Sequence, residues 1–132
     1  MSLSMSISRR AQIEGVPAPT APYSATVTYG DYIFVSGLCG VRESDGLPAD
    51  GDEERVRLIF QHLGRVLEAH GRSPSDVLVS KVYVTDMVRH RPLINRAYEE
   101  FFGPTRPTRT ILEVSGLSQD DTIEVEVIVS AR

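Results

Sequence analysis

Two stretches of the sequence each carry a single apolar stripe at the spacing of an α-helix, so each needs a surface to pack against. Residues 52–70 open with three acidic residues, which favour a helix N-terminus, and Gly71 follows as a natural stop. Residues 88–102 end at Gly103-Pro104. Two helices that each have one apolar face are best covered by the same face of one sheet. The stripes consist of Val56, Ile59, Phe60, Leu63, Val66 and Leu67 in the first stretch and Ile94, Ala97, Tyr98 and Phe101 in the second.

The runs rich in β-branched and aromatic residues supply that sheet. Gly30-Asp31 separates the first two runs and predicts a two-residue hairpin turn of the II′ kind, because glycine comes first. The third run is strongly β-branched and reads as a central strand. The chain therefore predicts an α+β domain in the order β-β-α-β-α-β-β, a single sheet with two helices on one face. The runs are residues 24–29, 32–36, 77–85, 108–114 and 122–130.

Alternation along the last run separates Ile123, Val125 and Val127 from Glu124, Glu126 and Ile128. The sheet face away from the helices then mixes charged with apolar groups, and we expect it to pack against other subunits. Counting back from a turn near Ser118-Gln119 predicts that Arg109 lies opposite Glu124 on consecutive antiparallel strands.

The chain has 132 residues, which fits one domain. We expect residues 1–16 to form a leader and an extended N-terminus, and residues 17–132 to form the domain. Within the first stretch, Met1 to Met5 has no hydrophobic signal core, and we expect it to be a leader ahead of a natural start.

Composition argues against several classes of protein. The net charge is −4 and no basic stripe offsets it, so we expect no nucleic-acid partner. No apolar run approaches the ~18 residues of a membrane span, and the single cysteine fits a reducing, cytoplasmic location. His62, His70 and His90 show no metal-ligand spacing, and no cofactor motif is present, so neither a metal nor a cofactor is expected.

Arg109 is the residue most open to a functional interpretation. It lies in a proline-flanked strand among apolar neighbours, where a permanent charge needs an anionic partner. The ordinary interpretation is an exposed arginine or a structural pair with Glu124 or Glu113, and the alternative is a ligand carboxylate. Cys39 reads as a small apolar residue rather than a nucleophile. Tyr23, Ser36, Gly37 and Asn95 could each have a purely structural role.

Six motifs, in order and with compatible spacing from about residue 17 onward, resemble those of the reactive intermediate deaminase family (Rid, YjgF-like), also known as the translation-inhibitor endoribonuclease L-PSP family. They are Pro22-Tyr23-Ser24, Ile33-Phe34-Val35-Ser36-Gly37, Lys81 to Met87, Asn95-x-x-Tyr98-Glu99-x-Phe101-Phe102, Pro107-Thr108-Arg109-Thr110 and Ile123-Glu124-Val125-Glu126.

The resemblance implies a fold like bacterial chorismate mutase, with three subunits packing their sheets into a central barrel and ligand clefts between neighbours. It implies hydrolysis of 2-imino or enamine acids to 2-keto acids and ammonia, without a cofactor. Arg109 would grip the substrate carboxylate and Glu124 would position or activate water. The residues expected to bind substrate or line and brace the cleft are Tyr23, Ser36, Gly37, Asn95 and Ile111.

Three positions depart from the family pattern. Leu38 stands where glutamine is frequent, Ile111 where cysteine is frequent, and Leu117-Ser118 where Leu-Pro is common. The first two changes make the cleft more apolar, which favours a bulkier imine. They also keep open a non-enzymatic, carboxylate-binding regulatory trimer. An RNA-cleaving translation inhibitor is a third hypothesis, which the acidic net charge disfavours.

Overall fold

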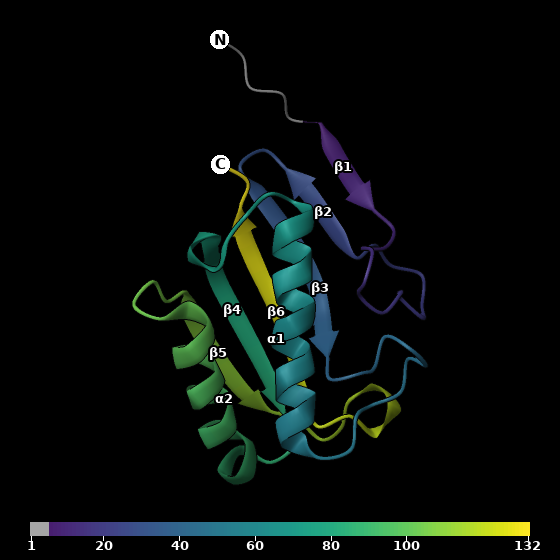
Figure 1. Cartoon of the computed structure of the whole chain (residues 1–132), viewed down its shortest axis with the longest axis vertical. Helices are drawn as coiled ribbons and strands as arrows, with labels where there is room; N and C mark the ends of the chain where they lie inside the picture. The colour runs from purple at the N-terminus through teal and green to yellow at the C-terminus, as the bar shows by residue number, and fades with distance from the viewer. Residues whose placement is uncertain (1–5) are drawn as a thin grey trace.

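The computed structural model describes residues 6–132 and folds them into one six-stranded sheet with two long helices (Figure 1). The sheet order is β1-β2-β3-β6-β4-β5, and all neighbours are antiparallel except the parallel pair β4 and β5. The strands are β1 (Ile7–Arg10), β2 (Thr26–Tyr29), β3 (Tyr32–Cys39), β4 (Val77–Val84), β5 (Thr108–Glu113) and β6 (Ile123–Ser130). The helices are α1 (Asp52–Ala69) and α2 (Met87–Phe102), with short 3-10 turns η1 (Pro74–Asp76) and η2 (Ser118–Asp120).

Both helices cover the same face of the sheet, as predicted (Figure 1). The apolar stripe of α1 is buried along its whole length, and the helix-facing residues of β6 are at most 3% exposed. Helix α2 begins where the Asp86 carboxylate accepts a hydrogen bond from the Arg89 N–H, and it ends at Gly103. Among the described helices, none is long and apolar enough to cross a bilayer.

The predicted hairpin is confirmed. Tyr29 pairs with Tyr32 across the two-residue turn, and Gly30 has φ +59° whereas Asp31 has no positive φ, as a II′ turn requires. The hairpin gains an outer neighbour, β1, that the sequence did not predict. All four β1 residues are exposed, so the strand lacks the alternation by which strands are recognised. Met1 to Met5, expected to be a leader, lie outside the described residues.

The predicted pairing of Arg109 with Glu124 is wrong. Strand β4 lies between β5 and β6, so Arg109 is in register with Ser80 while Glu124 is flanked by Cys39 and Tyr83. Ser80 points to α2, where the Tyr98 hydroxyl donates to it, so Arg109 points to the helix side of the sheet. Glu124 alternates with the buried valines of β6 and points to the opposite side. The segment between β5 and β6 crosses the end of β4 rather than closing a hairpin.

The sheet face away from the helices carries both apolar and charged groups, as expected from the alternation. Lys81 and Glu126 are in register near its centre, and the Tyr83 hydroxyl donates to Glu126. Around them the face exposes large apolar side chains by between 41% and 50% each: Tyr29, Tyr32, Phe34 and Leu112.

Candidate functional site

A cavity of about 380 Å³ lies where β3 loses its outer neighbour. The β2–β3 register runs as far as Val35, and the Ser36 N–H still donates to the Ala25 carbonyl oxygen at 3.0 Å. Residues 37–39 have no such neighbour among the described strands, and residues of segment 16–23 line the cavity beside them. The cavity is lined by residues from four parts of the chain: Val16, Pro17, Ala18, Thr20, Ala21, Tyr23, Ser36, Gly37, Leu38, Cys39, Val41, Gly46, His62, Ser118, Gln119 and Glu124.

A β-bulge shapes the sheet side of this cavity. Val35 pairs with Val127 and Leu38 with Val125, so Ser36 and Gly37 together oppose a single residue of β6. Bulges of this kind occur next to active sites, where they re-aim side chains. Here the bulge brings the Gly37 backbone against the Glu124 side chain: a Cβ at position 37 would lie 2.7 Å from the Glu124 carboxyl carbon. Only glycine leaves room for the carboxylate at this place.

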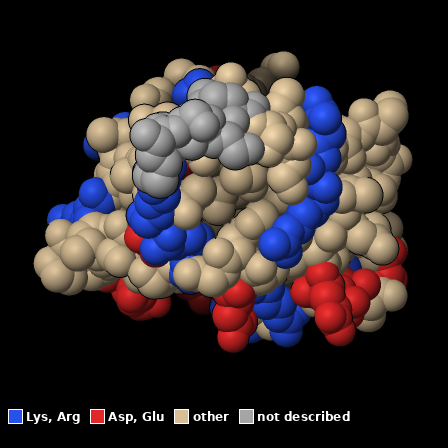
Figure 2. All heavy atoms as spheres, turned by 90° about the horizontal axis from the view of Figure 1, so that it is seen from above, with Lys and Arg blue, Asp and Glu red and all other residues tan. Residues whose placement is uncertain are grey.

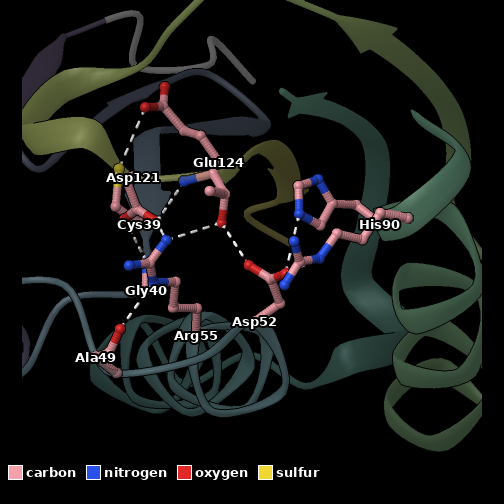
Figure 3. Close-up of polar contacts among 10 residues, drawn as sticks. Cys39, Gly40, Ala49, Asp52, Arg55, His90, Asp121 and Glu124 are labelled. Carbon is pink, nitrogen blue, oxygen red and sulfur yellow. Dashed lines mark hydrogen bonds and ion pairs between the residues drawn. The ribbon is translucent and has the colours of Figure 1, made fainter. Parts of the chain in front are cut away.

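The Glu124 carboxylate is also held by a hydrogen bond to one of its oxygens. The Cys39 thiol donates a hydrogen bond to Glu124 Oε1 at 3.2 Å (Figure 3). Burial, followed by the charge of Glu124 and this hydrogen bond, raises the pKa of the Cys39 thiol well above its ordinary value. The thiol therefore stays protonated and acts as a donor. The sequence-based interpretation of Cys39 as merely apolar missed this contact, because only the β3–β6 register brings the two residues together.

Two further predicted residues lie in the same cavity. The Ser36 hydroxyl donates to the Ser24 carbonyl oxygen at 2.6 Å, so its remaining capacity toward a ligand is that of an acceptor. Tyr23 lies nearby, and partial burial together with Cys39 and Glu124 raises the pKa of its phenol. Its hydroxyl thus remains a donor at neutral pH.

The structure adds lining residues that sequence reasoning did not single out. Ser118 and Gln119 come from η2, and Gln119 and Asp120 have φ of +59° and +57°, an unusual conformation for residues other than glycine. In the sequence, this side of the cavity was indicated only by Leu117-Ser118, which stands where Leu-Pro is common in the family. His62 lines the cavity from α1, where it had been read only as a histidine without metal-ligand spacing.

A buried polar network anchors the strand end that carries Glu124 (Figure 3). Asp121 is completely buried, accepts a hydrogen bond from the Gly40 N–H at 3.1 Å, and lies 3.8 Å from the Arg55 guanidinium. Arg55 also donates to the Thr122 hydroxyl at 3.0 Å. Thr122 in turn donates to Asp52 at 2.8 Å. These contacts tie the start of α1 to β6 and to the turn after Cys39.

Of the predicted site residues, the structure brings Tyr23, Ser36, Gly37 and Glu124 together and leaves three elsewhere. Arg109 lies over the Tyr98 ring, 4.9 Å from its centroid, and makes no ion pair with any described residue. Ile111 packs against the core from the same side of β5. Asn95 is exposed on α2. Glu113, considered as a partner of Arg109, instead accepts the Met87 N–H.

No three metal-ligating side chains gather among residues 6–132. The polar groups that line the cavity include the Glu124 carboxylate with its Cys39 thiol donor, the Tyr23 phenol as a donor and the Ser36 hydroxyl as an acceptor.

Comparisons with known proteins agree with this fold. The sequence model described as endoribonuclease L-PSP matches residues 14–131. A RutC family protein of Pyrococcus horikoshii is 34% identical over 116 residues, which cover 87% of this chain and 91% of the relative. A protein of Salmonella typhimurium named 2-iminobutanoate/2-iminopropanoate deaminase is 30% identical over 129 residues, covering 96% and 100%.

The solved structure of the YjgF gene product of E. coli superimposes with a TM-score of 0.85 at 29% identity, covering 95% of this chain and 100% of that one. Sequence and structure thus agree over nearly the whole length. The chain belongs to the Rid/YjgF-like family.

Proposed function

We propose that the protein hydrolyses reactive 2-imino or enamine acids to 2-keto acids and ammonia. The observation that carries the proposal is the Glu124 carboxylate, seated on Gly37 and held by the Cys39 thiol inside a cavity. In this reaction Glu124 orients a water molecule and takes one of its protons as the oxygen bonds to the imine carbon. That proton goes to the nitrogen, which gives a carbinolamine. The carbinolamine hydroxyl then gives its own proton to Glu124, which passes it to the amine nitrogen, and ammonia leaves as the C–N bond breaks and the C=O bond forms. Water is the only co-reactant.

The relative named 2-iminobutanoate/2-iminopropanoate deaminase supports this assignment, because it is similar over its whole length. The site needs no metal or cofactor for such a reaction, since the imine carbon is already electrophilic.

The carboxylate of the substrate needs a cation, and none of the described residues that line the cavity is a lysine or an arginine. Arg109 points to the other side of the sheet, with β4 between β5 and β6. We therefore infer that Arg109 of a second copy reaches the cavity, in a homotrimer that packs the exposed sheet faces into a barrel. The apolar groups on that face, Phe34 and Leu112 among them, would be covered by such packing. Ile111 and Asn95 would then act from the neighbouring subunit or not at all.

The test measures the hydrolysis of imines that an amino-acid oxidase generates in the assay. Hydrolysis is monitored as the release of ammonia or as the decrease in the amount of imine that semicarbazide traps. The wild-type protein should accelerate hydrolysis. Glu124→Gln and Arg109→Ala should each lose about 100-fold or more, since they remove the proton acceptor and the carboxylate clamp. Arg106→Ala is the matched control, because Arg106 is exposed and donates only to the Gly103 carbonyl oxygen. Unaccelerated hydrolysis across several amino-acid-derived imines would overturn the proposal.

The two other hypotheses predict different results. A regulatory binding protein would bind 2-keto acids without turnover. An RNA-cleaving protein needs a surface that attracts phosphate, and the face seen in Figure 2 instead carries its basic side chains in separate groups, with acidic ones beside them. The net charge of −4 points the same way, and a gel-shift at low salt tests it.

A further inference from the structure

Arg109 is a partly buried cation without an anion beside it. It lies on the edge strand β5, on the helix side of the sheet, and forms no ion pair with any described residue. A permanent charge that is drawn out of water needs a favourable contact. The structure supplies the ring of Tyr98, whose centroid lies 4.9 Å from the guanidinium carbon, within the ~6 Å over which an aromatic face attracts a cation.

The Tyr98 ring is itself fixed by its neighbours. It is 7% exposed, and the Phe60 ring meets it edge-on at a centroid distance of 5.6 Å and an interplanar angle of 82°. The ring of Phe102, one turn further along α2, lies 5.1 Å away at 53°. Aromatic pairs prefer such arrangements to a face-to-face sandwich. Because the interior is close-packed, the Tyr98 ring has little freedom to turn away from Arg109.

The Tyr98 hydroxyl connects this ring to the strand that carries Arg109. It donates to the Ser80 hydroxyl at 2.9 Å, and Ser80 donates to the Thr108 carbonyl oxygen, also at 2.9 Å. Ser80 has one proton to give, so toward Tyr98 it can only accept. Burial raises the pKa of Tyr98, which keeps the phenol protonated at neutral pH. Since Thr108 directly precedes Arg109, Tyr98 is linked to the arginine at its backbone as well as at its guanidinium.

An arginine held in this way suits the carboxylate of a ligand. A mobile arginine side chain loses rotamer entropy when a ligand fixes it, and this loss weakens binding. For Arg109 much of the loss already occurs on folding. The ring also attracts the cation without neutralising its charge, whereas a carboxylate of the protein would compete with that of the ligand.

We propose that Tyr98 is a positioning residue, which holds the Arg109 guanidinium in the orientation that binds the substrate carboxylate. This rests on the proposed function, in which Arg109 completes the cavity of a neighbouring subunit. Tyr98 touches no substrate and acts through Arg109 alone. Binding of ligands with a carboxylate therefore depends on Tyr98, and binding of their uncharged analogues does not.

NMR spectroscopy tests whether the contact exists in solution. Protons over the face of an aromatic ring resonate upfield, so the Hε and Hδ protons of Arg109 should resonate upfield of those of Arg106, which is exposed and donates to the Gly103 carbonyl oxygen. The upfield shift should persist in Tyr98→Phe, which keeps the ring, and disappear in Tyr98→Leu.

Titration with 2-oxobutanoate and with its methyl ester measures recognition of the carboxylate. The ester lacks the charge, so the ratio of the two dissociation constants reports on Arg109. Tyr98→Leu should lower the preference for the acid about 10-fold, and Tyr98→Phe should lower it about 3-fold. Phe101→Leu is the matched control, because Phe101 lies on the same helix and packs on Phe60 and Phe102. It should leave both the Arg109 shift and the preference for the acid unchanged.

If Tyr98→Leu fails to fold, the wild-type chemical shift and the binding ratio of Tyr98→Phe still decide the matter. The positioning role would be overturned by Arg109 protons that show no upfield shift in the wild type. It would also be overturned by a preference for the acid that is the same in every folded Tyr98 variant as in the wild type.

Imine hydrolysis separates this proposal from the proposed function. If the shifts and binding ratios are as expected and no imine is hydrolysed faster, Tyr98 positions Arg109 and the deaminase assignment fails. If imines are hydrolysed and Arg109→Ala loses activity, but Tyr98→Leu keeps the wild-type KM and binding ratio, the deaminase holds and the positioning role fails. When both are correct, Tyr98→Leu raises KM about 10-fold and changes kcat by less than about 2-fold, because substrate and transition state carry the same carboxylate.

Discussion

Cys39 and Glu124 are directly opposite residues of β3 and β6, and their contact makes a chemical prediction. Burial and the Glu124 charge raise the pKa of the thiol, so the thiolate fraction is small. At pH 8 an ordinary cysteine with pKa ~8.5 is about one quarter thiolate. We expect iodoacetamide to alkylate native Cys39 at least ~10-fold more slowly than the same cysteine in urea. Mass spectrometry measures this cleanly, because the chain has one cysteine.

Glu124→Gln provides the control for that prediction. It removes the charge that raises the pKa and leaves the burial, so alkylation should become faster than in the wild type and stay slower than in urea. An unchanged rate in Glu124→Gln would show that access alone protects the thiol.

Gly37→Ala tests how closely the carboxylate is seated. The added Cβ would lie 2.7 Å from the Glu124 carboxyl carbon, so the side chain must move. Displacement of a catalytic group by about 1 Å costs on the order of 100-fold in rate, and we expect that loss in kcat/KM for imine hydrolysis. Gly64→Ala on α1 is the control, with its nearest neighbour Phe101 at 4.0 Å. It should leave activity unchanged and raise the free energy of unfolding by about 0.5–1 kcal/mol. Full activity in Gly37→Ala would contradict the seating of Glu124.

At the scale of the elements, Arg55 joins α1 to β6. Its guanidinium donates to the Ala49 carbonyl oxygen at 2.8 Å and to the Thr122 hydroxyl, and it lies beside the buried Asp121. Arg55→Ala should lower the free energy of unfolding by about 2 kcal/mol, because charge-assisted hydrogen bonds are lost and Asp121 stays buried. Urea unfolding measures it. Arg57→Ala on the same helix removes an exposed pair with Glu54 and an exposed hydrogen bond to the Gln61 side chain, and should leave the urea midpoint unchanged. Equal effects of the two variants would contradict the role of the network.

The elements also show which parts of the fold the sequence could predict. Apolar spacing encodes which face of a helix or strand is buried, so α1, α2 and the two sides of β6 followed from it. Alternation does not encode which strand is the neighbour. That is why β5 was placed beside β6 rather than parallel to β4, and why Arg109 was paired with Glu124. Strand β1, exposed throughout, has no such pattern.

The residues of the candidate site likewise fall into those that the sequence could predict and those that it could not. Tyr23, Ser36, Gly37 and Glu124 were named from motifs and lie in one cavity. His62 could not be found this way, because it occupies a buried position on α1 among the apolar stripe and no motif contains it, although it lines the cavity. The motifs thus locate the residues that they contain, and they do not locate the lining residues that α1 and η2 contribute.

At the scale of the whole molecule, the positions of Arg109 and Glu124 predict complementation between inactive variants. One chain holds them on opposite sides of its sheet, so each complete site would take Glu124 from one subunit and Arg109 from its neighbour. Arg109→Ala and Glu124→Gln should each be inactive alone. If they are unfolded together at equal amounts and refolded, half the subunits supply Glu124 and half supply Arg109. About one quarter of the sites in a cyclic oligomer then contain both residues.

The refolded mixture should therefore recover about one quarter of wild-type activity, whereas the two variants refolded separately and then combined should recover none until subunits exchange. Light scattering should give the mass of three chains for each preparation. A monomer, or a mixture that stays inactive although it refolds into oligomers, would mean that Arg109 does not complete the cavity of a neighbour. Recovery near one quarter requires that the two residues act across a subunit boundary. Every subunit in the mixture lacks either Arg109 or Glu124, so a site built within a single chain would always be incomplete.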